Sequence, residues 1–152
     1  TVFALSANVE IGCVVYTLSI RKEPIMDEKL HKIRFDTEKA AKYFTKIMAY
    51  TVGPVELQDM MADKKVEVID VRDKEDFDDG HIPNAISMPR AEMPDRLNEL
   101  SKDKLYVVYC YNQQCHLGAC ACRFLAVNDY HAMHLDGGFK VWSEDFKFDV
   151  QK

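Results

Sequence analysis

The sequence has no apolar run long enough to cross a membrane and no cluster of basic residues. Its longest apolar run, Ile11 to Ile20, is shorter than the roughly 20 residues of a spanning helix and contains Gly12, Thr17 and Ser19. The formal net charge is -5 at pH 7, which argues against nucleic acid or a membrane as a partner. The N-terminus also lacks a basic segment with a small-residue cleavage site, so we expect no secretory signal.

The number of cysteines is odd, and most of them lie close together in the sequence. Five occur in 152 residues, and four of these lie between Cys110 and Cys122. A secreted domain stapled by disulfides carries an even set over a shorter chain. The clustering favours a reducing compartment, and we expect a cytoplasmic protein. No internal repeat or low-complexity segment is present, and the length suits one domain with a sizeable core.

Apolar runs alternate with helical patterns along most of the chain. This order predicts an α/β fold with a mostly parallel sheet of four to five strands, at 66–69, 85–88, 105–109 and 131–135. A lead-in helix is predicted over 37–52, with Asp36 or Thr37 as its N-cap. Residues 36–152 are thus expected to form the main domain. Residues 1–35 are expected to be an N-terminal arm or an accessory strand or hairpin, with a connector at Lys29 to Arg34.

The stretch Leu105 to Val127 combines a buried strand, a polar loop and a helix. The apolar run ends at Cys110, and small and apolar residues resume at helical spacing from Leu117. A thiol at this junction faces the N-terminal end of the helix, where unpaired backbone N–H groups favour an anion. The order of elements therefore predicts a nucleophilic Cys110 with a lowered pKa. Asp70 also ends a predicted strand, and ligands bind at the carboxyl ends of such strands.

Three separated segments resemble signatures of the rhodanese-like sulfurtransferases. They are Val68 to Arg72 with Phe77 and Gly80 to Ala85, Val107 to Cys110, and Leu135 to Phe139 with Trp142. Their order and spacing agree with the family over residues 54–145. The lead-in helix and Cys115, in the pattern C-x4-C with Cys110, resemble a single-domain subgroup of that family. The resemblance implies a three-layer domain with a central sheet between helices.

The resemblance also implies an enzyme, a thiosulfate or persulfide sulfurtransferase. Cys110 would take sulfane sulfur from a small donor, carry it as a persulfide and pass it to a thiol, cyanide or a protein; a protein donor stays open. No cofactor is implied. The loop after Cys110 would bind the substrate, and its residues are Tyr111, Asn112, Gln113, Gln114, Cys115 and His116. Three further residues would support the site structurally, namely Asp70, Arg72 and His81.

The cysteine loop has no Arg or Lys, although many family members carry one there. Only His116 in this loop can take a positive charge. Backbone amides and neutral side chains would then bind the donor through weaker hydrogen bonds, so a thiol-type donor is as plausible as thiosulfate. The same absence argues against a cysteine phosphatase, because an Arg stands six positions after the nucleophile in that class and His116 stands there here.

The role of Cys115 stays open at this point. It could resolve the Cys110 persulfide, form a reversible disulfide with Cys110, or stay reduced as a packing residue. The alternatives to an enzyme are a non-catalytic sulfur-carrier or protein-binding module and a thiol-redox sensor that uses Cys110 and Cys115. Cys120 and Cys122 are expected to be small buried packing residues. No metal site is expected, because Cys-x-x-Cys pairs are absent and Cys120 and Cys122 face different sides of the helix.

Overall fold

The computed structural model describes residues 28–152, so the strand or hairpin expected near residues 9–20 lies outside the described residues. The chain divides into two compact units, Thr1–Ala41 and Lys42–Lys152. In the first unit, helix α1 (Glu28–Arg34) occupies the segment expected to be a connector. This helix was not predicted from the sequence. An exposed i,i+4 ion pair joins Lys32 to Glu28 at 2.9 Å and adds a small stabilisation to it.

Helix α2 (Thr37–Tyr50) begins where the sequence predicted. The N–H of Lys39 donates to Asp36 Oδ1 at 3.0 Å, which is the expected N-cap contact. The helix ends before the predicted residue 52, because Thr51–Val52 form strand β1 instead. The Thr51 hydroxyl closes the last turn by donating to the Ile47 carbonyl at 2.8 Å. A strand of two residues has too little alternation to be read from a sequence.

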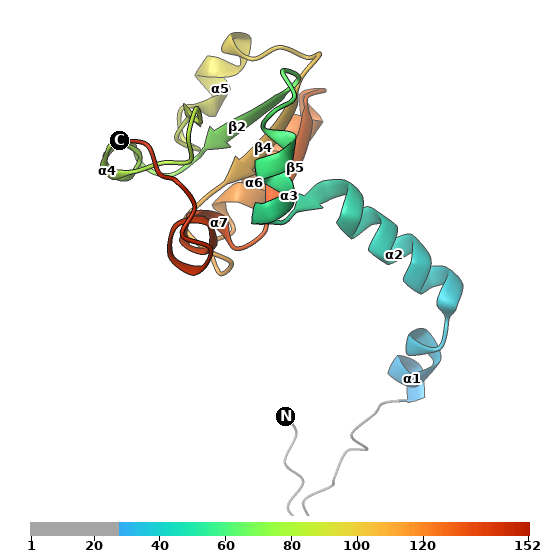
Figure 1. The fold of residues 1–152 in the computed structure, drawn as a ribbon. Coiled ribbons are helices and arrows are strands. Elements are labelled where there is room, and N and C mark those ends of the chain that lie inside the picture. Colours follow the sequence, from blue (N-terminus) through green and yellow to red (C-terminus); the bar gives the residue numbers. More distant parts are fainter. Residues whose placement is uncertain (1–27) are drawn as a thin grey trace, which may run out of the picture. The chain divides into compact units, whose positions relative to one another are not determined.

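The second unit is built around a five-stranded sheet whose order is β1-β5-β4-β2-β3 (Figure 1). Every pair of neighbouring strands is parallel, so the predicted α/β fold with a central parallel sheet is confirmed. Strand β4 lies in the middle of the sheet, between β5 and β2. The remaining strands are β2 (Val66–Asp70), β3 (Ile86–Ser87), β4 (Leu105–Tyr109) and β5 (His131–Leu135).

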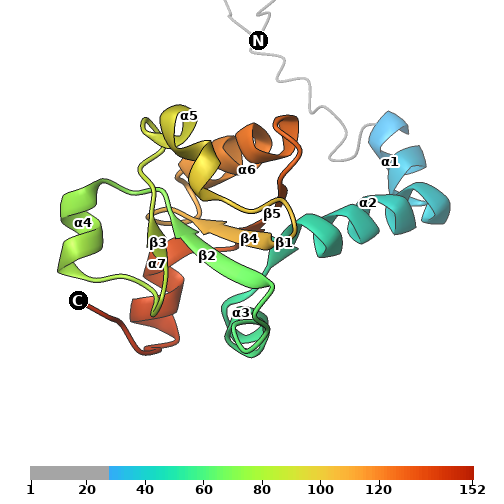
Figure 2. The ribbon, with the colours of Figure 1, turned by 90° about the horizontal axis from the view of Figure 1, so that it is seen from above.

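Helices cover both faces of this sheet and complete three layers. Figure 2 shows α5 (Met93–Arg96) and α6 (Leu117–Val127) on one face, and α3 (Pro54–Met60) and α7 (Gly138–Lys140) on the other. Alternation along β4 divides the core: Tyr106 and Val108 pack beneath α6, whereas Val107 and Tyr109 pack on the opposite face.

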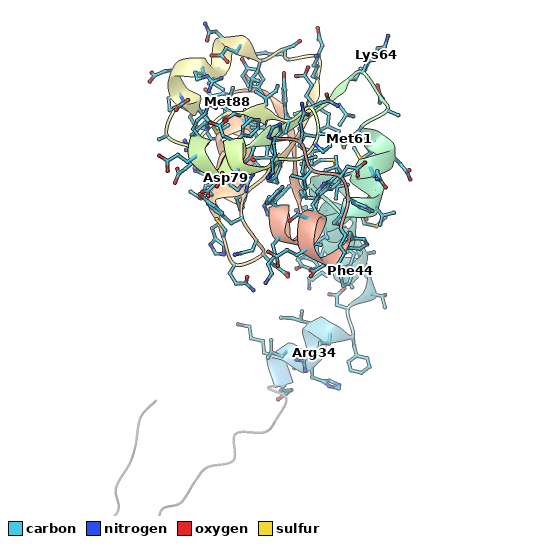
Figure 3. The ribbon with its side chains drawn as sticks, turned by 60° about the vertical axis from the view of Figure 1, so that its left-hand side comes forward. Arg34, Phe44, Met61, Lys64, Asp79 and Met88 are labelled. Carbon is cyan, nitrogen blue, oxygen red and sulfur yellow. The ribbon has the colours of Figure 1, made fainter. Side chains whose placement is uncertain are left out.

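Shorter elements complete the fold around these layers. Helix α4 (Lys74–Asp79) follows β2, a 3-10 turn η1 (Leu97–Glu99) follows α5, and a π-helical turn η2 (Val141–Asp145) follows α7. Met88, labelled in Figure 3, is fully buried just after β3. Within residues 28–152, each helix is too short or too polar to cross a bilayer.

Candidate active site

Cys110 follows directly on strand β4, at the carboxyl edge of the sheet. Asp70 stands opposite Tyr109 in the register of β2 and β4, so both predicted residues lie at the same edge. The pairing continues one step further, because the N–H of Val71 donates to the Tyr109 carbonyl at 3.1 Å. Cys110 is fully buried. The central strand therefore holds the thiol in a fixed, dry position.

The loop after Cys110 folds back over the thiol. Asn112 Oδ1 accepts the N–H groups of Gln114 at 3.0 Å and Cys115 at 3.1 Å, which closes a tight Asx turn. The Cys110 thiol donates to the Cys115 carbonyl at 3.2 Å. The backbone N–H groups of Gly118 and Asn112 also face the sulfur and favour its anionic form. Asn112 from the loop and Gly118 from α6 thus offer their amides to Cys110, whereas Asn112 Oδ1 accepts the amides of Gln114 and Cys115.

The pKa of Cys110 is raised rather than lowered. Burial is the largest cause, and it outweighs the hydrogen bond from the Gly118 N–H, so that the pKa of the thiol is raised to about 11. The neighbouring Cys115 thiol raises it further, through a side-chain hydrogen bond and through charge. The sequence prediction of a lowered pKa was therefore wrong for this state. The prediction included the effect of the helix N-terminus on the pKa. The loss of water around the sulfur depends on the folded structure and could not be included.

The turn before α7 holds the loop from the other side. The N–H of Phe139 donates to the Cys110 carbonyl, and the N–H of Lys140 donates to the Tyr111 carbonyl, each at 2.9 Å. Gly137 and Gly138 have φ values of 79° and 63°, and this left-handed turn aims the first amides of α7 at the loop. The Gly-Gly signature therefore fixes the backbone on which Cys110 sits.

Asp70 and Arg72 form a buried pair that joins three segments. Arg72 Nη2 donates to Asp70 Oδ2 at 2.6 Å and to the Gly80 carbonyl at 2.7 Å. The guanidinium carbon of Arg72 lies 4.0 Å from the centre of the Phe139 ring. These contacts connect the end of β2 with the segment after α4 and with α7, and they support the structural role that the resemblance implies.

His81 has contacts of the same structural kind. Its ring stacks on Phe77 at 3.7 Å, and its Nδ1 lies 2.9 Å from the Phe77 carbonyl oxygen. Its backbone forms two 2.9 Å hydrogen bonds with Gln151, which attach the C-terminal segment.

The other loop residues differ in how they are held. The Tyr111 hydroxyl donates to Asp76 at 2.6 Å, and this bond raises the pKa of Tyr111 to about 12. Gln113, Gln114 and His116 are exposed. His116 precedes α6 but makes no side-chain capping bond. Apart from His116, the exposed residues of the loop have no ionisable side chain.

The described cysteines are all free thiols. Cys122 is partly buried and packs against the core, as predicted. Its pKa is raised to about 12, mainly by burial and also by the nearby Cys110. Cys120 is exposed, so its predicted burial was wrong; two residues along a helix lie on nearly opposite faces. Between residues 28 and 152, no three His, Cys, Asp or Glu side chains are grouped to hold a metal ion.

Two residues beside Cys110, Gly118 and His134, were not predicted from the sequence. A Cβ on Gly118 would lie 2.5 Å from His134 Nε2 and 3.5 Å from Cys110 Sγ. His134 therefore lies close to the thiol, although it comes from the neighbouring strand β5. The signal in the sequence was its alternation with Met133 and Leu135, which face the opposite side of the sheet. That alternation indicates on which face of the sheet His134 lies, but it does not indicate which strand lies next to β5.

Comparison with known proteins gives the class of protein. The model of the rhodanese-like domain matches residues 53–145. This is more than half of the chain, and the chain therefore belongs to the rhodanese-like domain family.

Individual relatives and a solved structure are similar to parts of this chain. An HTH-type transcriptional regulator of Mycobacterium tuberculosis is 38% identical over 78 residues, which are 51% of this chain but only 34% of the regulator. The thiosulfate sulfurtransferase GlpE of Pseudomonas syringae is 29% identical over 59% of this chain and 83% of that protein. A crystal structure of a Bacillus halodurans protein has a TM-score of 0.71 at 27% identity, and covers 76% of this chain and 86% of that one.

Proposed function

We propose that this protein transfers sulfane sulfur through a persulfide on Cys110. The observation that carries the proposal is the position of Cys110, buried at the end of the central strand with the N–H groups of Asn112 and Gly118 facing its sulfur. A persulfide at this point is an anion, and oriented amides in a dry site stabilise an anion without reorganisation. Membership of a family with thiosulfate sulfurtransferases adds to this support.

The proposed cycle has two displacements. The Cys110 thiolate attacks the outer sulfur of thiosulfate, a new S–S bond forms, and sulfite leaves with the electrons of the old S–S bond. With a persulfide donor, a thiolate leaves in place of sulfite. An acceptor thiolate, cyanide or a protein thiol then attacks the outer sulfur of the Cys110 persulfide, and the Cys110 thiolate is released.

The loop chemistry bears on the choice of donor. Gln113 and Gln114 are exposed and neutral, and Arg72 in the supporting cluster is already paired with Asp70. Recognition then depends on neutral hydrogen bonds, which suit a small sulfur oxyanion or a persulfide of low charge. We propose both as donors, with no nucleic acid or membrane partner.

The test is sulfur loading followed by intact mass. Reduced full-length protein is treated with thiosulfate, with glutathione persulfide or with a cysteine desulfurase, and one added sulfur atom is expected. Cys110→Ser should abolish the gain, whereas the exposed Cys120→Ser should retain it. Loss of the sulfur on adding cyanide or a thiol indicates turnover, and sulfur that is loaded but never released indicates a carrier module. Absence of loading with every donor would refute the proposal.

One contact favours a second candidate, a thiol-redox switch. The Cys110 thiol donates to the Cys115 carbonyl at 3.2 Å, and the Cys115 thiol is near enough to raise the pKa of Cys110. A peroxide could oxidise this pair to a disulfide, with two electrons passing to the peroxide and two protons released. A mass loss of two hydrogens after mild peroxide treatment, absent in Cys115→Ser, is the expected sign. An unchanged mass in wild-type protein would contradict it.

A further inference from the structure

His134 projects from β5 toward the buried thiol of Cys110. It stands opposite Val108 in the register of β4 and β5, two residues before Cys110 on the same face of the central strand. His134 Nε2 and Cys110 Sγ lie 2.5 Å and 3.5 Å from one point, the position that a Cβ on residue 118 would occupy. The two atoms can therefore be no further apart than the sum of these distances. Because Gly118 has no side chain, the space between His134 Nε2 and Cys110 Sγ stays open.

His134 Nε2 is buried and has no hydrogen-bond partner among residues 28–152. Buried polar atoms are almost always paired, because an unpaired one carries its full desolvation penalty. A core histidine that served packing alone would be expected to have its ring nitrogens satisfied. An unpaired nitrogen beside a buried thiol is therefore a candidate for a group that acts during the reaction.

We infer that His134 accepts the proton of the Cys110 thiol at Nε2 and then pairs, as an imidazolium, with the anionic persulfide. The inference rests on the proposed sulfur transfer, and it adds a residue to that reaction. The thiol proton now points to the Cys115 carbonyl. It must turn toward His134, and the ring must shift slightly toward the sulfur, since no hydrogen bond joins them in this structure.

The protons and charges balance through the cycle. A neutral thiol and a neutral imidazole become a thiolate and an imidazolium. The thiolate takes the outer sulfur of thiosulfate, sulfite leaves as a dianion, and the persulfide remains as a monoanion opposite the imidazolium. Transfer of this sulfur to cyanide releases thiocyanate and the Cys110 thiolate, which then recovers its proton from His134.

The groups around His134 agree with this role. Burial lowers the pKa of His134, and the negative charge of Asp136 partly opposes that effect, so the imidazole is neutral near pH 7. Titratable groups on this face of the sheet include the Cys110 thiol and, from α6, the Cys122 thiol, and burial raises the pKa of both. Both therefore hold their protons at neutral pH.

The rate of Cys110 alkylation against pH tests this inference without any sulfur donor. In the full chain, iodoacetamide should react in two pH steps, one at the pKa of His134 and one at that of the thiol, with a plateau between them. His134→Asn should lose the lower step and react roughly a hundredfold more slowly at neutral pH. The matched control is His131→Asn, an exposed histidine on the same strand, which should keep both steps. Identical profiles for wild type and His134→Asn would overturn the inference.

A second measurement needs no variant and holds even if His134→Asn fails to fold. The pKa of His134 is followed by NMR after Cys110 is alkylated with iodoacetate, which adds an anion, or with iodoacetamide, which adds a neutral group. A higher pKa beside the anionic adduct is expected, and equal values would refute the pairing. Because neither readout uses sulfur loading, a failure of every sulfur donor would remove the proposed function alone.

Discussion

Gly138 lies against the backbone of Cys110 so closely that a Cβ on it would come within 2.6 Å of the Cys110 carbonyl oxygen. The same Cβ would lie 3.0 Å from the amide nitrogen of Asn112, one of the two N–H groups that face the sulfur. The position of the thiol therefore depends on a missing side chain some thirty residues further along the chain.

We expect Gly138→Ala to destabilise the protein and to displace the cysteine loop. The left-handed φ of 63° alone should cost about 1–2 kcal/mol in an L-residue, and the contact with backbone atoms adds to this. Urea unfolding and the rate of sulfur loading on Cys110 measure the two effects. Gly53→Ala is the control, because a Cβ there meets no atom of the described residues within 4 Å. Equal behaviour of the two variants would show that the close approach has no consequence.

Arg72→Met should destabilise the domain strongly, by roughly 3–5 kcal/mol, because it leaves the fully buried Asp70 carboxylate without its partner. Arg72→Lys should cost less, since it keeps a charge but loses the two-pronged contact and the bond to Gly80. Denaturant unfolding compares them. The double variant Asp70→Asn with Arg72→Met should recover part of the loss, and a strictly additive result would contradict the buried pairing.

The stabilisation that Cys110 contributes should decline at alkaline pH. Burial raises its pKa from 9.0 to about 11, so the folded protein holds this proton more tightly than the unfolded chain. The contribution is complete below pH 9.0 and is lost as the pH rises to about 11. The free energy of unfolding of wild type minus that of Cys110→Ser, measured across this interval, should fall. A difference that stays constant or grows would show that the thiol is not buried as described.

Gln113→Arg should accelerate sulfur loading from thiosulfate, by up to roughly tenfold at low salt, because it places a cation in an exposed and neutral loop. Gln113→Glu should slow the same reaction. Added salt should reduce both effects, since exposed charges are screened. Gln58→Arg, at another exposed site, on α3, is the control for net charge. Insensitivity to the sign of the charge at residue 113 would indicate that thiosulfate does not enter past this loop.

Much of the fold was predictable because its signals are local. The apolar runs at Val66 and Leu105 predict buried strands, Asp36 predicts a helix start, and both predictions hold in the structure. Strands that alternate with helices pair in parallel, so the carboxyl edge of the sheet follows, and with it the shared edge of Asp70 and Cys110. Strand β1 and helix α1 were not predicted. Strand β1 has two residues, too few to show alternation, and none of the residues of α1 is buried, so α1 has no buried apolar face that the sequence could show.

The amino-acid sequence by itself determined the order of strand, cysteine loop and helix, because these follow from periodicity and turn chemistry within some twenty residues. Only the tertiary structure decided how the thiol is surrounded. Burial, which raises the pKa of Cys110, depends on how the cysteine loop and α6 pack around the sulfur, and the approach of His134 depends on β5 lying beside β4. Desolvation and proximity are properties of the packed molecule, and local patterns along a chain do not contain them.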